Sequence, residues 1–142
     1  MTTKVLLVDD EKDFLDVLGE RMKIRGMDVS TVASAKDALK ITEKQSFDAI
    51  VLDLMMPEMD GLELLQTIKA KNPELQVILL TGHGSIEKGV EAMRLGAMDF
   101  LEKPADLESL TEKIKKAQAR KMILVERKAE EEVRNILISK GW

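Results

Sequence analysis

Five short runs of β-branched and aliphatic residues alternate with longer segments in which apolar residues recur three and four positions apart. The short runs predict buried strands at 5–8, 27–32, 49–52, 77–80 and 98–101. Parallel strands need crossover connections, and strands that are apolar on both sides are typical of a sheet covered on both faces. The alternation therefore predicts an α/β fold with a doubly wound, five-stranded parallel sheet flanked by five helices.

The apolar spacing places one helix after each strand. The expected helices span 14–22, 35–44, 62–68, 86–95 and 107–117. Gly26 and Gly96 end the first and the fourth of them, and Pro73 follows the third. In a doubly wound sheet, ligands bind outside the carboxyl ends of the strands, where the strand order reverses. Functional residues are therefore expected directly after the strands.

The helical pattern continues past the fifth expected helix, because neither Gly nor Pro occurs between Pro104 and Gly141. We therefore expect a globular domain at 1–117 and a C-terminal helical extension at 118–142. The charge balance changes in the same region. The chain up to Pro104 carries 13 basic and 19 acidic side chains, whereas the remainder carries 9 and 7.

The extension has an apolar stripe of its own. Met122, Val125, Ala129 and Ile136 follow a three and four spacing, which Glu132 interrupts. A solitary helix of this kind is marginal in water. The extension is therefore expected to pack on a partner surface and to mediate self-association.

Composition excludes several classes of protein. A chain of 142 residues fits one domain with a short appendage. Its net charge of −4 argues against direct binding to nucleic acid. No apolar run approaches the roughly 20 residues that a membrane span needs. The chain has no cysteine and no secretory signal pattern, so we expect a cytoplasmic protein.

Polar residues stand at the ends of four of the five strands. Asp9 and Asp10 follow the first strand, Asp53 ends the third, Thr81 follows the fourth and Lys103 follows the fifth. In the predicted fold these positions converge, and three close carboxylates repel one another unless they are protonated or share a cation. Mg²⁺ prefers carboxylates together with water and phosphate oxygens. The pattern therefore predicts a magnesium site that takes part in phosphate chemistry.

The remaining two residues suit the same chemistry. The Lys103 ammonium can hold a phosphoryl oxygen, and the Thr81 hydroxyl can donate a hydrogen bond to another. Phosphoryl transfer mostly requires positioning and neutralisation of charge. Asp53 would then be the nucleophile that forms an aspartyl-phosphate.

Residues 4–104 resemble the receiver domain of two-component response regulators. The similarity is carried by the pair Asp9-Asp10, the run from Asp53 to Gly61, the turn from Thr81 to Gly84, and the run from Asp99 to Pro104. The stretch 79–104 is most similar to receivers of the nitrogen-regulation and dicarboxylate-transport class. The resemblance implies a flavodoxin-like receiver fold.

The resemblance also implies the roles of the acidic residues. Asp53 would accept a phosphoryl group from a sensor histidine kinase or a histidine phosphotransfer protein. Asp10, Asp53 and the main-chain carbonyl of Met55 would ligate Mg²⁺, and Asp9 would act on the ion largely through water. Such a module catalyses only its own phosphorylation and dephosphorylation, and it is not an enzyme that turns over a metabolite.

In this family a threonine and an aromatic residue move when the phosphoryl group is bound, and the matching residues here are Thr81 and Phe100. The output surface would consist of the helix 86–95, the strand 98–101 and the helix 107–117. A homodimer would form through this surface or through the C-terminal helix. The resemblance also implies a cis peptide bond between Lys103 and Pro104.

Other interpretations remain open at this point. The chain could be a receiver fragment of a longer transcriptional regulator, cut within a linker helix. A small Mg²⁺-dependent phosphatase would also use an aspartyl nucleophile, but such enzymes place a second carboxylate two residues later, where this chain has Met55. A flavin-binding module is disfavoured, because acidic strand ends would repel a flavin phosphate.

Overall fold

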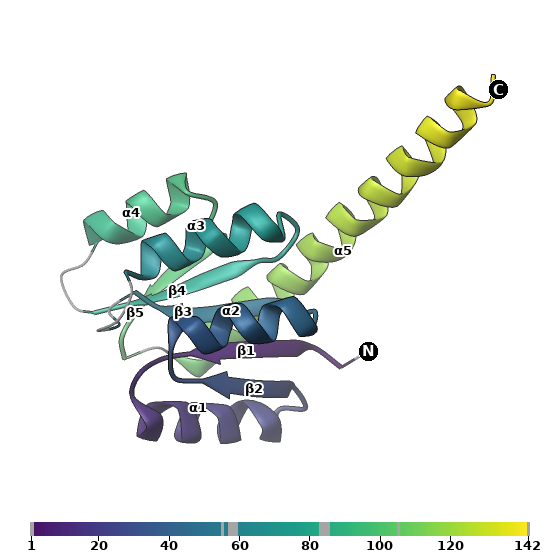
Figure 1. Ribbon diagram of the computed structural model, residues 1–142. Helices are drawn as coiled ribbons and strands as arrows, with labels where there is room; N and C mark the ends of the chain where they lie inside the picture. The colour runs from purple at the N-terminus through teal and green to yellow at the C-terminus, as the bar shows by residue number, and fades with distance from the viewer. Residues whose placement is uncertain (1, 55, 57–59, 83–85, 105, 142) are drawn as a thin grey trace.

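The computed structural model describes residues 2–54, 56, 60–82, 86–104 and 106–141, without the side chain of Ile86. Strands and helices alternate along the chain (Figure 1). The strands are β1 (Lys4–Val8), β2 (Asp28–Val32), β3 (Ala49–Asp53), β4 (Val77–Thr81) and β5 (Asp99–Glu102). The helices are α1 (Lys12–Ile24), α2 (Ala35–Lys44), α3 (Gly61–Lys71), α4 (Ile86–Arg94) and α5 (Leu107–Ser139).

The five strands form one parallel sheet in the order β2-β1-β3-β4-β5. The chain runs from β1 outward to β2, then crosses back to β3 on the other side of β1. The strand order therefore reverses between β1 and β3, and this is where a doubly wound sheet binds ligands. The predicted fold class is confirmed.

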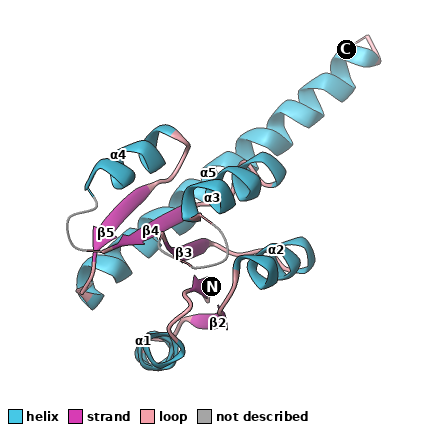
Figure 2. Ribbon diagram, turned by 60° about the vertical axis from the view of Figure 1, so that its left-hand side comes forward, coloured by secondary structure: helices cyan, strands magenta, loops and turns pink. Residues whose placement is uncertain are grey.

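The sheet is covered on both faces. Alternate residues of each strand point to opposite faces, so Leu6 and Val8 belong to one buried cluster and Val5 and Leu7 to the other. The first cluster includes apolar residues of α2, α3 and α4, and the second includes those of α1 and α5. Figure 2 shows the sheet with helices on either side. Burial on both faces explains why the strands are uniformly apolar.

α3 begins close to the end of β3. The Asp60 carboxylate caps this helix by accepting a hydrogen bond from the Leu62 N–H at 3.0 Å. Gly61, the first helical residue, donates its N–H to the Leu54 carbonyl at 3.2 Å. A Cβ atom on Gly61 would lie only 2.6 Å from Leu54 Cα. Glycine is therefore required for the close approach that holds the backbone directly after Asp53.

α4 buries its smallest residues. Gly89 and Ala92 face the interior, whereas Val90 and Met93 are half-exposed. A Cβ atom on Gly89 would lie 2.9 Å from Cδ2 of Phe100, so the aromatic ring of β5 rests directly against this glycine. α4 and β5 are thus packed closely enough that Phe100 cannot move without affecting the helix.

α5 is one continuous helix that continues well beyond the sheet. Asp106 caps its start, and Leu110, Ile114 and Ala117 are buried. The Lys121 ammonium donates hydrogen bonds to Ser46 Oγ and to a neighbouring carbonyl oxygen, each at 2.6 Å. Figure 1 shows the rest of the helix projecting away from the domain, and residues 125–141 are exposed. None of the described helices combines the length and apolar character needed to cross a bilayer.

Candidate functional site

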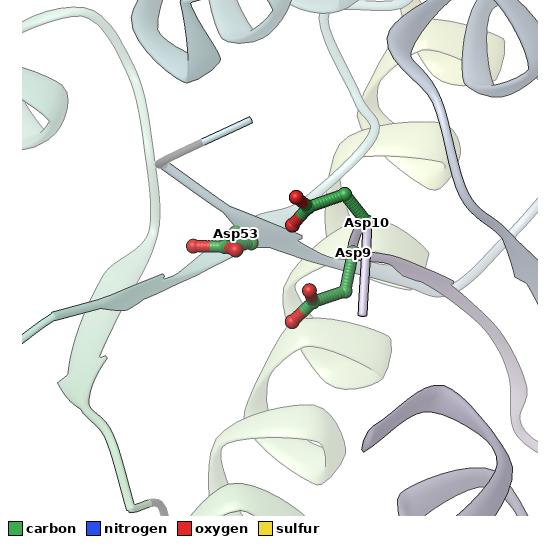
Figure 3. Close-up of side chains that lie close together, drawn as sticks. All are labelled: Asp9, Asp10 and Asp53. Atoms are coloured by element: carbon green, nitrogen blue, oxygen red, sulfur yellow. The ribbon is translucent and has the colours of Figure 1, made fainter. Parts of the chain in front are cut away.

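Three carboxylates meet at the point where the strand order reverses. Asp9 follows β1, Asp10 is the next residue, and Asp53 ends the neighbouring strand β3. One carboxylate oxygen from each residue lies within 4.8 Å of the other two. Figure 3 shows the three side chains gathered at this edge of the sheet. Asp9 and Asp53 are only 2% and 4% exposed, whereas Asp10 is open to solvent.

The local backbone holds Asp9 in this position. Its carboxylate accepts a hydrogen bond from the Glu11 N–H at 3.0 Å, which fixes the turn between β1 and α1. Glu11 occupies the N-cap of α1 without a capping bond from its own side chain. The start of the helix is therefore organised by a site residue rather than by a dedicated cap.

Lys103 supplies the positive charge of the site. Its ammonium donates a hydrogen bond to Asp9 at 2.7 Å and pairs with Asp53 at 3.5 Å. Burial lowers the pKa of Lys103, but the hydrogen bond to Asp9 and the negative charges of Asp53, Asp9 and Glu11 outweigh it and raise the pKa above its usual value. Lys103 is therefore protonated at neutral pH and offsets part of the carboxylate repulsion.

The backbone around Lys103 is attached to the adjacent strand. The Lys103 N–H donates to the Thr81 carbonyl at 2.8 Å, and the Lys103-Pro104 peptide bond is cis, as the resemblance implied. The Lys103 ammonium also lies 4.4 Å from the centroid of the Phe14 ring. A cation at this distance from an aromatic face is attracted by it. Phe14 is thus a site residue that the sequence interpretation assigned only to the helix α1.

Thr81 and Phe100 lie on the two neighbouring strands β4 and β5. Thr81 is buried, and its hydroxyl donates to the Leu101 carbonyl at 3.4 Å, near the long limit for a hydrogen bond. Phe100 is half-buried against α4. Met55, 57–59 and 83–85 lie outside the described residues, so the expected carbonyl ligand is not part of this geometry.

The residues present suit a hard divalent cation. Every side-chain donor of the cluster is a carboxylate oxygen, which Mg²⁺ prefers to nitrogen or sulfur ligands. Among the residues that the structure describes, these three carboxylates face the Lys103 ammonium, which leaves a negative charge that a cation would neutralise. Asp10 is exposed, so water can reach the cluster from this side. A Mg²⁺ ion needs such access because it keeps several water ligands.

Comparison with known proteins gives independent evidence for the family of the chain. The family model of the response regulator receiver domain matches residues 5–115. Over 115 residues the chain is 37% identical to the transcriptional regulatory protein ZraR of Escherichia coli, covering 81% of this chain and 26% of ZraR. Over 125 residues it is 34% identical to the C4-dicarboxylate transport transcriptional regulatory protein DctD of Rhizobium meliloti, covering 88% of this chain and 27% of DctD.

Solved structures of receiver domains resemble the chain in fold as well as in sequence. The crystal structure of a response regulator receiver domain protein from Clostridium thermocellum superposes with a TM-score of 0.82 at 35% identity, covering 86% of this chain and 98% of that one. The chain spans about a quarter of the length of the two regulators named above. The strand order, the acidic edge of the sheet and these similarities agree that the chain belongs to the receiver domain family of two-component response regulators.

Proposed function

We propose that Asp53 is the phosphoacceptor of this receiver and takes its phosphoryl group from a sensor histidine kinase or a histidine phosphotransfer protein. The observation that carries the proposal is the meeting of Asp9, Asp10 and Asp53 within 4.8 Å, with Lys103 bound to two of them. Phosphoryl transfer mostly requires positioning and neutralisation of charge. A buried carboxylate beside a fixed ammonium and a cation site provides both.

The transfer forms one bond at Asp53 and breaks one bond in the donor. An oxygen of the Asp53 carboxylate attacks phosphorus, an O–P bond forms, and the P–N bond to the donor histidine breaks. The electron pair of that bond stays on the histidine nitrogen, so the donor returns to neutral imidazole after taking up a proton. Lys103, 3.5 Å from Asp53, stabilises the negative charge on the phosphoryl oxygens.

Asp9, Asp10 and Asp53 would hold Mg²⁺, together with the main-chain carbonyl of Met55. The ion would neutralise phosphoryl oxygens during transfer. Without an ion, Lys103 already binds Asp9 and so keeps the two buried carboxylates in place. The chain's own residues therefore preorganise the pocket before the donor arrives.

Phosphorylation would act on the surface of α4, β5 and α5. A phosphoryl oxygen that accepts a hydrogen bond from Thr81 would compete with the long bond from Thr81 to the Leu101 carbonyl. Phe100, one residue before Leu101, would then change its packing against Gly89. The module would transfer and hydrolyse only its own phosphoryl group. We place it in the cytoplasm, because a chain without cysteine needs no oxidising compartment.

The test is phosphorylation of the purified chain by acetyl phosphate with Mg²⁺, followed by intact mass. We expect one added phosphoryl group in the wild type and none in Asp53→Asn. Asp28→Asn is the matched control, because it removes the same charge from an exposed position at the opposite end of the sheet. Full labelling of Asp53→Asn would move the acceptor elsewhere, and labelling without Mg²⁺ would contradict the metal site.

A further inference from the structure

The Lys103 ammonium has neighbours of two different kinds. It donates hydrogen bonds to Asp9 at 2.7 Å and to Asp53 at 3.5 Å, and it lies 4.4 Å from the centroid of the Phe14 ring. The two carboxylates stand at the carboxyl edge of the sheet, whereas Phe14 belongs to the first turn of α1. Only 20% of the Lys103 side chain is exposed. An aromatic ring therefore takes part in enclosing the positive charge of the site.

The Phe14 ring is fixed by the hydrophobic core. It is half-buried and packs against the apolar cluster that contains Leu7, Leu15 and Val51. The Lys103 side chain, in contrast, reaches the site on a flexible four-carbon stem, which loses conformational entropy when it is held in one place. The ring is thus the rigid member of the pair, and it restricts where the ammonium lies.

The position of the ammonium matters because two carboxylates compete for it. It is closer to Asp9 than to Asp53, yet Asp53 is the residue that would carry the phosphoryl group. A further carboxylate could also hold Lys103, but it would offset the positive charge that stabilises phosphoryl oxygens. An aromatic face attracts a cation without carrying a net charge. Leucine in place of Phe14 would still pack on the apolar cluster, so the attraction for the ammonium is what the aromatic residue adds.

We propose that Phe14 is a positioning residue for phosphoryl transfer, whose ring holds the Lys103 ammonium beside Asp53, where it meets the phosphoryl oxygens. The inference rests on the proposed function of Asp53 and adds to it a residue of α1. Phe14 acts through Lys103 and not on the phosphoryl group itself. Removal of the ring should therefore affect phosphoryl transfer only while Lys103 is present.

The first experiment is a double-mutant cycle on the rate of labelling by acetyl phosphate with Mg²⁺, followed by intact mass. Phe14→Leu should lower the rate by about fivefold, because the attraction of the ring for the ammonium is lost. In the Lys103→Met background the same change should have no further effect. Phe14→Tyr should label at nearly the wild-type rate, because the ring is kept. An unchanged rate for Phe14→Leu, or an equal loss in both backgrounds, would overturn the inference.

Leu18→Ala is the matched control for lost packing. Leu18 lies one turn after Phe14 in α1, is also half-buried, and packs against the same apolar cluster. Its truncation should make the chain easier to unfold in urea but should leave the labelling rate of the folded protein unchanged. A labelling rate that falls with stability in both Leu18→Ala and Phe14→Leu would show that Phe14 serves only the core.

The second experiment observes the contact by NMR in the unphosphorylated chain, without a phosphodonor. Because the ammonium lies over the Phe14 ring, the protons on Lys103 Cε should be shifted upfield by the ring in the wild type and in Phe14→Tyr, but not in Phe14→Leu. Equal shifts in all three proteins would refute the contact. The two proposals fail separately: a wild type that is not labelled on Asp53 contradicts the proposed function, whereas equal labelling of the wild type and Phe14→Leu contradicts only the role of Phe14.

Discussion

Replacing Gly61 by alanine should test whether the start of α3 really holds the end of β3. The added Cβ would lie 2.6 Å from Leu54 Cα and 2.8 Å from the Leu54 carbonyl oxygen. Both atoms belong to the backbone, so no side-chain rotation can relieve the contact. Either α3 or the backbone directly after Asp53 must shift.

The magnitude follows from two opposing effects. Overpacking of this kind costs about 1–3 kcal/mol. Alanine gains at most about 1 kcal/mol over glycine inside a helix, and less at the first helical position. We therefore expect the free energy of unfolding to fall by about 1–2 kcal/mol and the melting temperature to fall by roughly 3–8 °C.

Gly19→Ala is the matched control. Gly19 lies inside α1, and its added Cβ would be 3.5 Å from Thr31 Cγ2, an ordinary contact distance. Helix propensity should then dominate, and the variant should gain about 0.5–1 kcal/mol.

Urea unfolding followed by circular dichroism measures the stability of both variants. The rate of labelling by acetyl phosphate reports on the site, and it should fall for Gly61→Ala and stay unchanged for Gly19→Ala. A Gly61→Ala variant as stable as the wild type, or two alanine variants that change stability in the same direction, would show that the start of α3 does not hold the end of β3.

Three further predictions concern single side chains. Lys103→Met should bind Mg²⁺ at least about threefold more tightly by calorimetry, because the ammonium 2.7 Å from Asp9 no longer repels the ion; weaker binding would contradict this. Burial lowers the pKa of Lys69; the positive charge of Arg120 lowers it further, and the negative charge of Glu74 opposes this. Lys69 therefore loses its proton at a lower pH in the folded state than in the unfolded state. The unfolding free energy of the wild type should therefore rise relative to Lys69→Met as the pH rises towards 10.5, and a parallel pH dependence of the two would exclude the effect. Gly89→Ala should displace the Phe100 ring, seen as shifted aromatic NMR resonances, at a cost below about 1 kcal/mol, because a side chain can yield; unshifted resonances would refute the contact.

Hydrophobic periodicity was enough to predict the order and type of the elements. The strand ends were less well defined: β3, β4 and β5 each end one residue after the apolar run, at Asp53, Thr81 and Glu102. The Leu54 N–H donates to the Leu80 carbonyl at 3.1 Å, so the ladder between β3 and β4 continues past the apolar run. Polar residues at the ends of strands have no apolar signal, and only the hydrogen bonds of the sheet show that they belong to it.

The sequence by itself determined that acidic residues would meet at one edge of the sheet, because strand–helix alternation sends every parallel strand in the same direction and its carboxyl end to that edge. It did not determine which neighbours surround them. The contacts of Phe14 with Lys103 and of Gly61 with Leu54 join residues whose spacing in the chain carries no common pattern. Only close packing of helices on the sheet brings such residues together, because periodicity describes which face is buried and not what lies opposite it.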